Sequence, residues 1–430
     1  MYQIENSGQV LKANESAGRS LWRRPRVSRN VFFLGLTSFF TDISSEMVST
    51  ILPLYLVLTL GLAPFQFGIV DGLYQGAATL VRLASGVITD RTHRYKETAA
   101  SGYALSAIAK PALLLAGNVW PFLVGIIVVD RLGKGIRTAP RDALISLSSP
   151  RTELATAFGV HRALDTAGAM LGPLLAFGLL ALVPGGFDVI FVVSFCVALI
   201  GLGILVLFVQ NRHITREIAE ANAGREESIP KAVSLKAAFG LLRIPNFRML
   251  VIVGAALSLV TMSDSFLYLG MQEHLNFGGG FFPLLYVATA LIYMILAVPV
   301  GRLADRIGHK TVFIAGYLLL LLAYTSLLLP SAGLLEVVVF LLLLGAYYAA
   351  TDGVLMALAS TVLPQELRTS GLGLLTTATG LSRLLASVLF GALWSQWGIQ
   401  VAVQAFILAL VAALLFGGGA LIRSTRGSKI

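Results

Sequence analysis

Two acidic residues lie four positions apart inside the first long apolar segment of the chain, in the stretch FFTDISSEMVST. On a helix Asp42 and Glu46 share one face, and Ser38, Ser45 and Ser49 fall within the same arc of about 100°. Carboxyl groups in an apolar segment are costly unless they face a cavity, a cation or a proton. The pattern therefore favours a polar stripe that binds protons or a solute, with a structural ion pair as the competing interpretation.

Other ionisable residues also fall inside apolar segments of the first half. They are Asp71, Arg82, Lys110, Asp130, Arg131, Lys134, Arg137, His161, Arg162 and Asp165. Such groups normally face a cavity or a partner of opposite charge. We expect Asp42 or Glu46 to pair with Arg131, and Arg82 or Lys110 are the alternative partners.

Composition defines the elements that must position these groups. Of the 430 residues, 56% are hydrophobic and 13% are charged, whereas soluble chains are about 45–50% apolar and about 25% charged. We predict an all-α polytopic membrane protein, because a β-barrel would need short alternating segments. The net charge of +10 reflects basic residues between apolar runs, so we expect a lipid bilayer and no nucleic acid as partner.

Twelve apolar segments are long enough to cross a bilayer. They are 30–60, 65–90, 98–117, 120–145, 153–183, 187–209, 247–270, 281–304, 311–329, 333–362, 368–395 and 400–422. Every second connection lacks Lys and Arg, and the opposite set is rich in both. The positive-inside rule then predicts that both termini are cytoplasmic, in a multi-pass protein of the inner membrane.

The segments divide into two groups of six. We expect a cytoplasmic tail at 1–29, a six-helix bundle at 30–209, a cytoplasmic linker at 210–246, a second bundle at 247–422 and a tail at 423–430. An internal repeat supports this division, because GVITDRTHRYK in the first half matches GRLADRIGHK at about half the chain length further on. Two six-helix repeats are a known transporter architecture with a substrate site between the halves.

The repeated motif resembles the loop signature of the major facilitator superfamily, Gly-x-x-x-Asp-Arg-x-Gly-Arg-Lys. The first copy matches at Gly86, Asp90, Arg91 and Arg94, with His93 in place of the second glycine. The second copy supplies the residues Gly301, Asp305, Arg306 and Lys310. The resemblance implies that both loops latch the two halves at the cytoplasmic side, whereas the alternative is that they are ordinary basic flanks.

Two further motifs are similar to signatures of this family. RLGKG, which begins at Arg131, resembles the fourth-helix signature of the family. In proton-coupled members the arginine of this signature is associated with proton translocation. GAMLGPLLAFG resembles the fifth-helix signature of drug/proton antiporters at Gly168, Gly172 and Pro173, but lacks its final glycines. Gly168 and Gly172 also form a small-x-x-x-small face for close helix packing, so packing and pathway sealing are both possible roles.

The resemblance implies a secondary transporter that works by alternating access, with protons as the coupling ion. We expect proton-coupled export, by antiport, of a small organic or amphipathic compound. The alternative is proton-coupled uptake of an anionic metabolite or metal chelate, and a channel or receptor fits the doubled motif less well. No enzyme activity, catalytic residue, metal site or cofactor is expected, because the sequence has no P-loop and no His/Cys cluster. We expect a monomer.

The two halves differ in charge. The second half holds Asp264, Asp352 and Arg383 in apolar segments, so we expect ion coupling in the first half and more of the substrate fit in the second. Alternating access changes the burial of a carboxyl group and its distance to an arginine, and both change its affinity for a proton. His161 either titrates in the same range or is a structural histidine.

Overall fold

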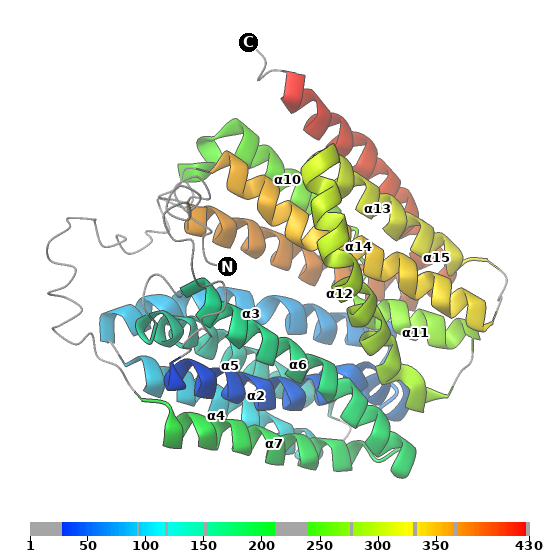
Figure 1. The fold of residues 1–430 in the computed structure, drawn as a ribbon. Coiled ribbons are helices and arrows are strands. Elements are labelled where there is room, and N and C mark those ends of the chain that lie inside the picture. The colour runs from blue at the N-terminus through cyan, green and yellow to red at the C-terminus, as the bar shows by residue number, and fades with distance from the viewer. Residues whose placement is uncertain are drawn as a thin grey trace, which may run out of the picture.

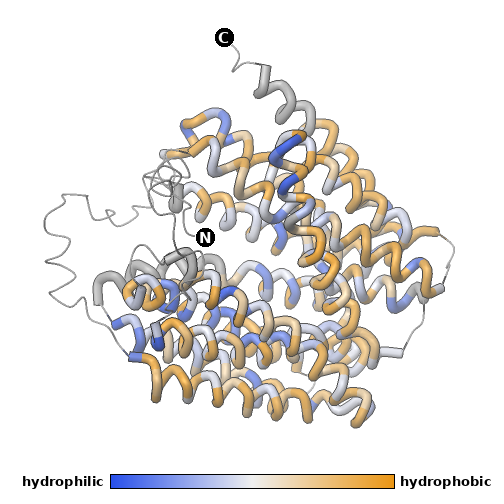
Figure 2. The backbone as a smooth tube through the Cα atoms, in the orientation of Figure 1, coloured by the Kyte–Doolittle hydropathy of each residue, from blue (hydrophilic) through white to orange (hydrophobic). Residues whose placement is uncertain are grey.

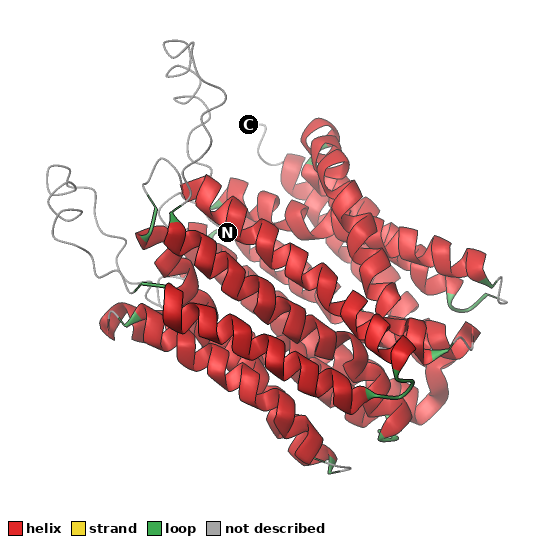
Figure 3. Cartoon of the chain, turned by 60° about the horizontal axis from the view of Figure 1, so that its bottom comes forward, coloured by secondary structure: helices red, strands yellow, loops and turns green. Residues whose placement is uncertain are grey.

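A computed structural model describes residues 28–92, 94–116, 119–149, 154–210, 240–275, 278–329, 333–363 and 368–426. Helices make up nearly all of this part of the chain, and it contains no strand (Figure 3). The predicted all-α class is therefore confirmed. The predicted tails and the linker lie mostly outside the described residues.

Six long helices follow one another in the first half (Figure 1). They are α2 (Arg29–Leu54), α3 (Pro64–Thr92), α4 (Tyr95–Leu115), α5 (Trp120–Leu147), α6 (Leu154–Leu182) and α7 (Phe187–Phe208). A π-helical turn, η1 (Tyr55–Thr59), extends α2. The side chain of Ser28 caps the start of α2 by accepting a hydrogen bond from the backbone N–H of Val31.

The second half has the same kind of helices with two irregularities. Its elements are η3 (Leu241–Arg243), α10 (Pro245–Leu259), α11 (Asp264–Leu275), η4 (Gly279–Phe281), α12 (Phe282–Ile307), α13 (His309–Ser326), α14 (Leu334–Val362) and α15 (Arg368–Arg426). The seventh predicted segment breaks between α10 and α11, where the freed backbone N–H of Met262 donates to the Tyr324 hydroxyl at 2.7 Å. α15 covers the last two predicted segments, with a kink at Gly398, whose φ of 82° favours glycine.

Twelve membrane crossings result when α10 and α11 count as one and α15 as two. Within the described residues, eight segments are long and apolar enough by composition alone, and one of them is the double-length stretch in α15. The helices α3, α4 and α5 are not among these segments, and they carry intramembrane charges such as Asp71, Lys110 and Asp130. Figure 2 shows hydrophobic residues along α7 and hydrophilic residues gathered where α12 meets α13.

The two ends of the helices differ in charge. We call the end with the connections at 60–63, 183–186 and 278–281 the cation-free end, because these connections lack Lys and Arg, and the opposite end, which carries Arg94 and Arg302, the basic end. One hydrophobic core joins both halves toward the cation-free end. At the basic end each half has its own separate core cluster.

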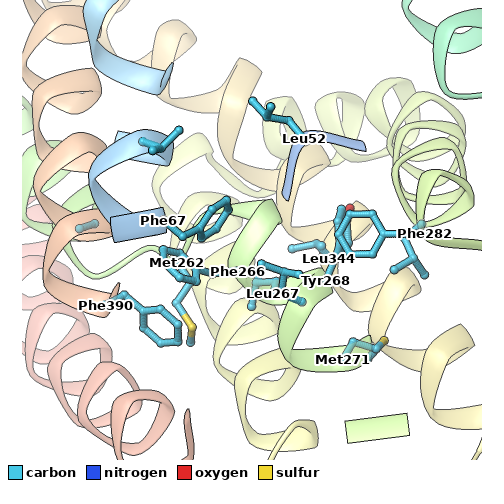
Figure 4. Close-up of a cluster of buried hydrophobic side chains, with 14 of the residues drawn as sticks. Leu52, Phe67, Met262, Phe266, Leu267, Tyr268, Met271, Phe282, Leu344 and Phe390 are labelled. Carbon is cyan, nitrogen blue, oxygen red and sulfur yellow. The ribbon is translucent and has the colours of Figure 1, made fainter. Parts of the chain in front are cut away.

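Aromatic residues tie the halves together in the shared core (Figure 4). Phe266 of α11 lies with its ring centroid 4.9 Å from Phe67 of α3 and 4.9 Å from Phe390 of α15. Leu52 and Phe282 belong to the same cluster. The halves are thus packed tightly against each other near the cation-free end.

Glycines allow α3 and α15 to approach closely in this region. A Cβ atom on Gly68 would lie 2.6 Å from the carbonyl oxygen of Ser387, and one on Gly72 would lie 2.7 Å from that of Leu384. Such contacts are too short for any side chain, so only glycine fits. We call this glycine-lined contact between the halves the α3–α15 seam.

Candidate functional site

Small residues on α6 bring the polar face of α2 against it. A Cβ atom on Gly172 would lie 2.7 Å from the carbonyl oxygen of Ile43, and one on Gly168 would clash with the carbonyl oxygen of Phe39. Pro173 is buried within the same helix. These contacts favour the packing role for the glycine motif, and they set Asp42 opposite α6.

The consequence is a pair of facing carboxyl groups. The side chains of Asp42 on α2 and Asp165 on α6 lie close to each other. Two facing carboxyl groups repel each other when both are ionised, so such a pair favours holding one proton. Asp42 Oδ1 also lies 3.8 Å from Arg137 Nη2, and Asp165 Oδ1 lies 3.8 Å from Arg141 Nη1.

Other polar groups complete this charged network. His161 Nε2 lies 2.9 Å from the hydroxyl of Ser38 and is buried. The guanidinium group of Arg137 lies 4.7 Å from the ring centroid of Tyr103, a favourable cation–π geometry. Arg141 donates to Asp142 at 2.9 Å. One arginine nitrogen, Nη1 of Arg137, is buried without a hydrogen-bond partner in the described part of the chain.

The sequence interpretation missed Arg141 and Asp142. A signal for them exists, because Lys134, Arg137 and Arg141 follow one another at helical spacing on α5. Arg141 and Asp142 both fall inside the predicted segment 120–145, but they were not included among its ionisable groups. In the structure α5 runs through Pro140 to Leu147.

Of the two expected partners of Arg131, Asp42 is not one, because Asp42 faces Arg137. The guanidinium group of Arg131 forms an ion pair with the neighbouring Asp130 at 2.5 Å and stacks 3.8 Å from the ring centroid of Tyr74. Lys110 Nζ lies 3.5 Å from the same carboxylate. Asp130 thus has two buried cationic partners, and Arg131 is not the ion-pair partner of Asp42.

Glu46 faces this second group of charges rather than the carboxyl pair. Its carboxylate accepts a hydrogen bond from Ser49 at 2.7 Å. Between Ser49, Tyr74 and Arg131 lies a small cavity with room for a water molecule. Asp42 and Glu46 therefore lie on one helix face but serve two separate clusters.

The second half replaces charge with tyrosine hydroxyls. Asp264, at the start of α11, accepts a hydrogen bond from the Tyr348 hydroxyl. Tyr268 donates to Thr289 at 2.7 Å, and its ring lies 4.6 Å from that of Tyr286. These tyrosines come from α11, α12 and α14 and form an aromatic cluster next to Asp264.

One half-exposed ion pair lies in the second half. Asp352 on α14 lies 3.8 Å from Arg383 on α15, and their side chains are 48% and 39% exposed. Among the residues that the structure describes, no three His, Cys, Asp or Glu side chains are grouped so that they could hold a metal ion.

The loop motifs are only partly described. Gly86, Asp90 and Arg91 belong to α3, but the surroundings of Gly86 and the side chains of Asp90 and Arg91 lie outside what the structure describes, and Arg94 is exposed. In the second copy, the exposed Asp305 lies 3.2 Å from His309 Nε2, one turn further on. Gly301, Arg306 and Lys310 lie near these two residues in the sequence, around the α12–α13 connection. Their gating role stays a prediction.

The helix arrangement defines a class of protein: a two-half, twelve-helix membrane transporter fold. The family model of the Major Facilitator Superfamily matches residues 34–282 and 259–429. The chain therefore belongs to the major facilitator superfamily. This finding confirms the resemblance inferred from the loop motifs.

Three similar proteins illustrate the relationship. An uncharacterized MFS-type transporter, MJ1317, of Methanocaldococcus jannaschii is 31% identical over 416 residues, which cover 95% of this chain and 97% of the relative. The multidrug resistance protein MdtG of a Rahnella species is 26% identical and covers 78% of each chain. The crystal structure of a variant of the nucleoside transporter NupG superposes with a TM-score of 0.75 at 15% identity, over 90% of this chain and 99% of that one.

Proposed function

We propose that the protein is a proton-coupled secondary transporter that exports small organic or amphipathic compounds across the inner membrane. The observation that carries this proposal is the Asp42–Asp165 carboxyl pair between α2 and α6. A proton shared by the two groups is stabilised while they face each other. Any helix movement that separates them, or that moves Arg137 or Arg141 closer, favours its release.

The packing of the two halves supports alternating access. Near the cation-free end a single core closes the path between the halves, and at the basic end the two cores are separate. With both termini and the basic end in the cytoplasm, this arrangement is the inward-open state. Rocking of the halves about the central region would open the cation-free end and close the basic end, where the Asp305 and Arg306 loop lies.

Export is favoured by two observations of different kinds. The name of MdtG describes a multidrug resistance protein, and Gly168, Gly172 and Pro173 match the drug/proton antiporter signature. Aromatic rings such as Tyr268, Tyr286 and Tyr348 suit amphipathic compounds, because rings supply apolar contact area and hydroxyls supply hydrogen bonds.

Uptake of an anionic solute is the second candidate, and one observation favours it. Four cationic side chains lie around the carboxyl pair, namely Lys134, Arg137, Arg141 and Arg162. They outnumber the acids Asp42, Asp142 and Asp165 at the same place. An anion that binds here would neutralise the excess.

Reconstituted vesicles with an imposed pH gradient test the proposal. A panel of fluorescent amphipathic cations and anions is measured for gradient-driven transport and for counterflow at equal pH. In Asp42→Asn and Asp165→Asn we expect gradient-driven transport to fall to the level of empty vesicles, while counterflow continues. Asp188→Asn, at the start of α7, is the matched neutralisation outside the network. Wild-type gradient-driven transport in both variants would contradict the assignment of the proton to this pair.

A further inference from the structure

A buried carboxyl group outside this network lies between the two halves. Asp71 is on α3, and its side chain is buried at the α3–α15 seam. Its Oδ2 accepts a hydrogen bond from the hydroxyl of Ser387 on α15 at 2.7 Å. The amide nitrogen of Gln75 lies 3.4 Å away, and Ser263 and Ser265 lie next to the carboxyl group.

Asp71 has no cationic partner among the side chains that the structure describes. Within the described residues, no Lys or Arg side chain comes within 4.0 Å of its carboxyl oxygens, in contrast to Asp42 and Asp130. The ionisable groups that face it are Asp264 on α11 and Tyr286 on α12. Each of these groups is neutral or negative, so none of them compensates a negative charge.

The seam also excludes water. Gly68 and Gly72 allow the backbones of α3 and α15 to come into direct contact on either side of Asp71. An ionised carboxyl group that is buried without a cation is strongly disfavoured, and such groups are neutral or are not buried at all. Hydroxyl groups lower this cost but do not supply a compensating charge.

We propose that Asp71 is a second proton-binding site, which takes up a proton when the cation-free end closes and releases it to the water on that side when the end opens. The oxygen of the carboxyl group gains the proton from solvent as Ser387 approaches, and the O–H bond breaks again when the two helices part. The inference rests on the proposed alternating access of the halves. It does not depend on which group couples substrate transport to protons.

Protonation of Asp71 affects closure of the two halves, because the residues around its carboxyl group come from both halves. Asp71 and Gln75 belong to the first half, whereas Ser263, Ser265 and Ser387 belong to the second. Closure brings them together, and protonation removes the charge that opposes closure. If one proton binds on closure, the ratio of closed to open molecules falls by up to about tenfold for each unit of rising pH.

Spin-label distances across the cation-free end test the proposal. Leu58 and Trp397 are 55% and 63% exposed and lie on opposite halves at this end. They are replaced by labelled cysteines after Cys196 has been replaced by serine. Distance distributions in detergent and in lipid nanodiscs, without substrate, are then measured from acidic to alkaline pH. We expect the closed population of the otherwise unchanged protein to fall as pH rises.

Three variants give the site its decisive readouts. Asp71→Asn, which is neutral at every pH, should stay closed over the whole range. Ser387→Ala keeps the titrating group and should keep the pH dependence with a shifted midpoint. Asp188→Asn, an exposed neutralisation at the start of α7, should respond like the unchanged protein. Gradient-driven transport of Asp42→Asn is measured separately, so that failure of the proposed coupling pair and failure of this site are distinguishable.

Two outcomes would overturn the assignment. The first is a pH response of Asp71→Asn that coincides with that of the unchanged protein. The second concerns the salt. If the cation-free end closes at alkaline pH when sodium chloride replaces choline chloride at equal ionic strength, then Asp71 binds a sodium ion and not a proton. Monodisperse elution and an unchanged unfolding temperature establish that each variant is folded.

Discussion

The two halves bury polar groups in different ways. The first half buries charges in networks, such as Asp42 with Arg137 and Asp130 with Arg131. The second half buries tyrosine hydroxyls, and Asp264 accepts from a tyrosine rather than from a cation. Charged networks respond to a proton by rearranging, whereas tyrosines offer rings and neutral hydrogen bonds. The difference supports a division of labour between proton coupling and substrate fit.

The contrast extends to exposure. The Asp130–Arg131 pair has side chains that are 16% and 6% exposed, whereas the Asp352–Arg383 pair of the second half is 48% and 39% exposed. A buried charge that loses its partner is costly, and an exposed one finds water. The second half thus carries its ion pair where a solute can reach it.

The largest effect is expected from breaking the buried pair. Arg131→Ala leaves the Asp130 carboxylate with Lys110 alone, so we expect the free energy of unfolding to fall by about 3–5 kcal/mol. Arg383→Ala removes an arginine from the exposed pair and should cost less than about 1 kcal/mol. Thermal unfolding in detergent compares the two variants. Equal losses would remove the distinction between the halves.

A smaller effect is expected from the helix contact that sets up the carboxyl pair. Gly172→Val forces a side chain against Ile43 of α2, which should cost about 1–3 kcal/mol and abolish gradient-driven transport by displacing Asp42. Gly178→Val is the matched control, because a Cβ atom at that position of α6 has no neighbour within 4 Å. Unfolding temperature and vesicle transport are measured for both. A functional Gly172→Val protein would show that the close contact is dispensable.

The smallest effect is expected from the tyrosine cluster. Tyr348→Phe removes the hydrogen bond to Asp264, which should cost about 0.5–1.5 kcal/mol and raise KM for the substrate while the pH profile of transport stays the same. Tyr268→Phe removes the bond to Thr289 and serves for comparison. A changed pH profile in Tyr348→Phe would place proton coupling in the second half as well.

The membrane architecture follows from the sequence because hydropathy is a local property. Helix ends in the structure agree with the predicted segments to within a few residues, for example α7 at Phe187–Phe208 against 187–209. The exception is a local backbone feature, the break before Asp264, that hydropathy does not register. The kink at Gly398 falls in the predicted connection between 368–395 and 400–422. The loop motifs identified the family because their repetition at half the chain length can be read directly from the sequence.

The pairing of the intramembrane charges could not be derived in the same way. Asp42, Asp165 and Arg131 were all recognised as ionisable groups in apolar segments, but their partners lie on other helices. The choice of Arg137 over Arg131 depends on the rotation and depth of α5 relative to α2, which the packing of many side chains sets. The sequence assigned no role to Asp71 for the same reason, because its hydrogen-bond partner Ser387 lies on a helix of the other half.

The sequence by itself determined which residues are buried in a membrane, where each helix runs, and to which family the chain belongs. These properties depend on the composition of contiguous segments, and each segment carries its own information. Only the tertiary structure decided that Asp42 faces Asp165, that Arg131 is held by Asp130, and that Asp71 meets Ser387 of the other half. Those contacts depend on glycine-mediated approaches between helices far apart in the chain, and a linear pattern does not contain the distances between helices.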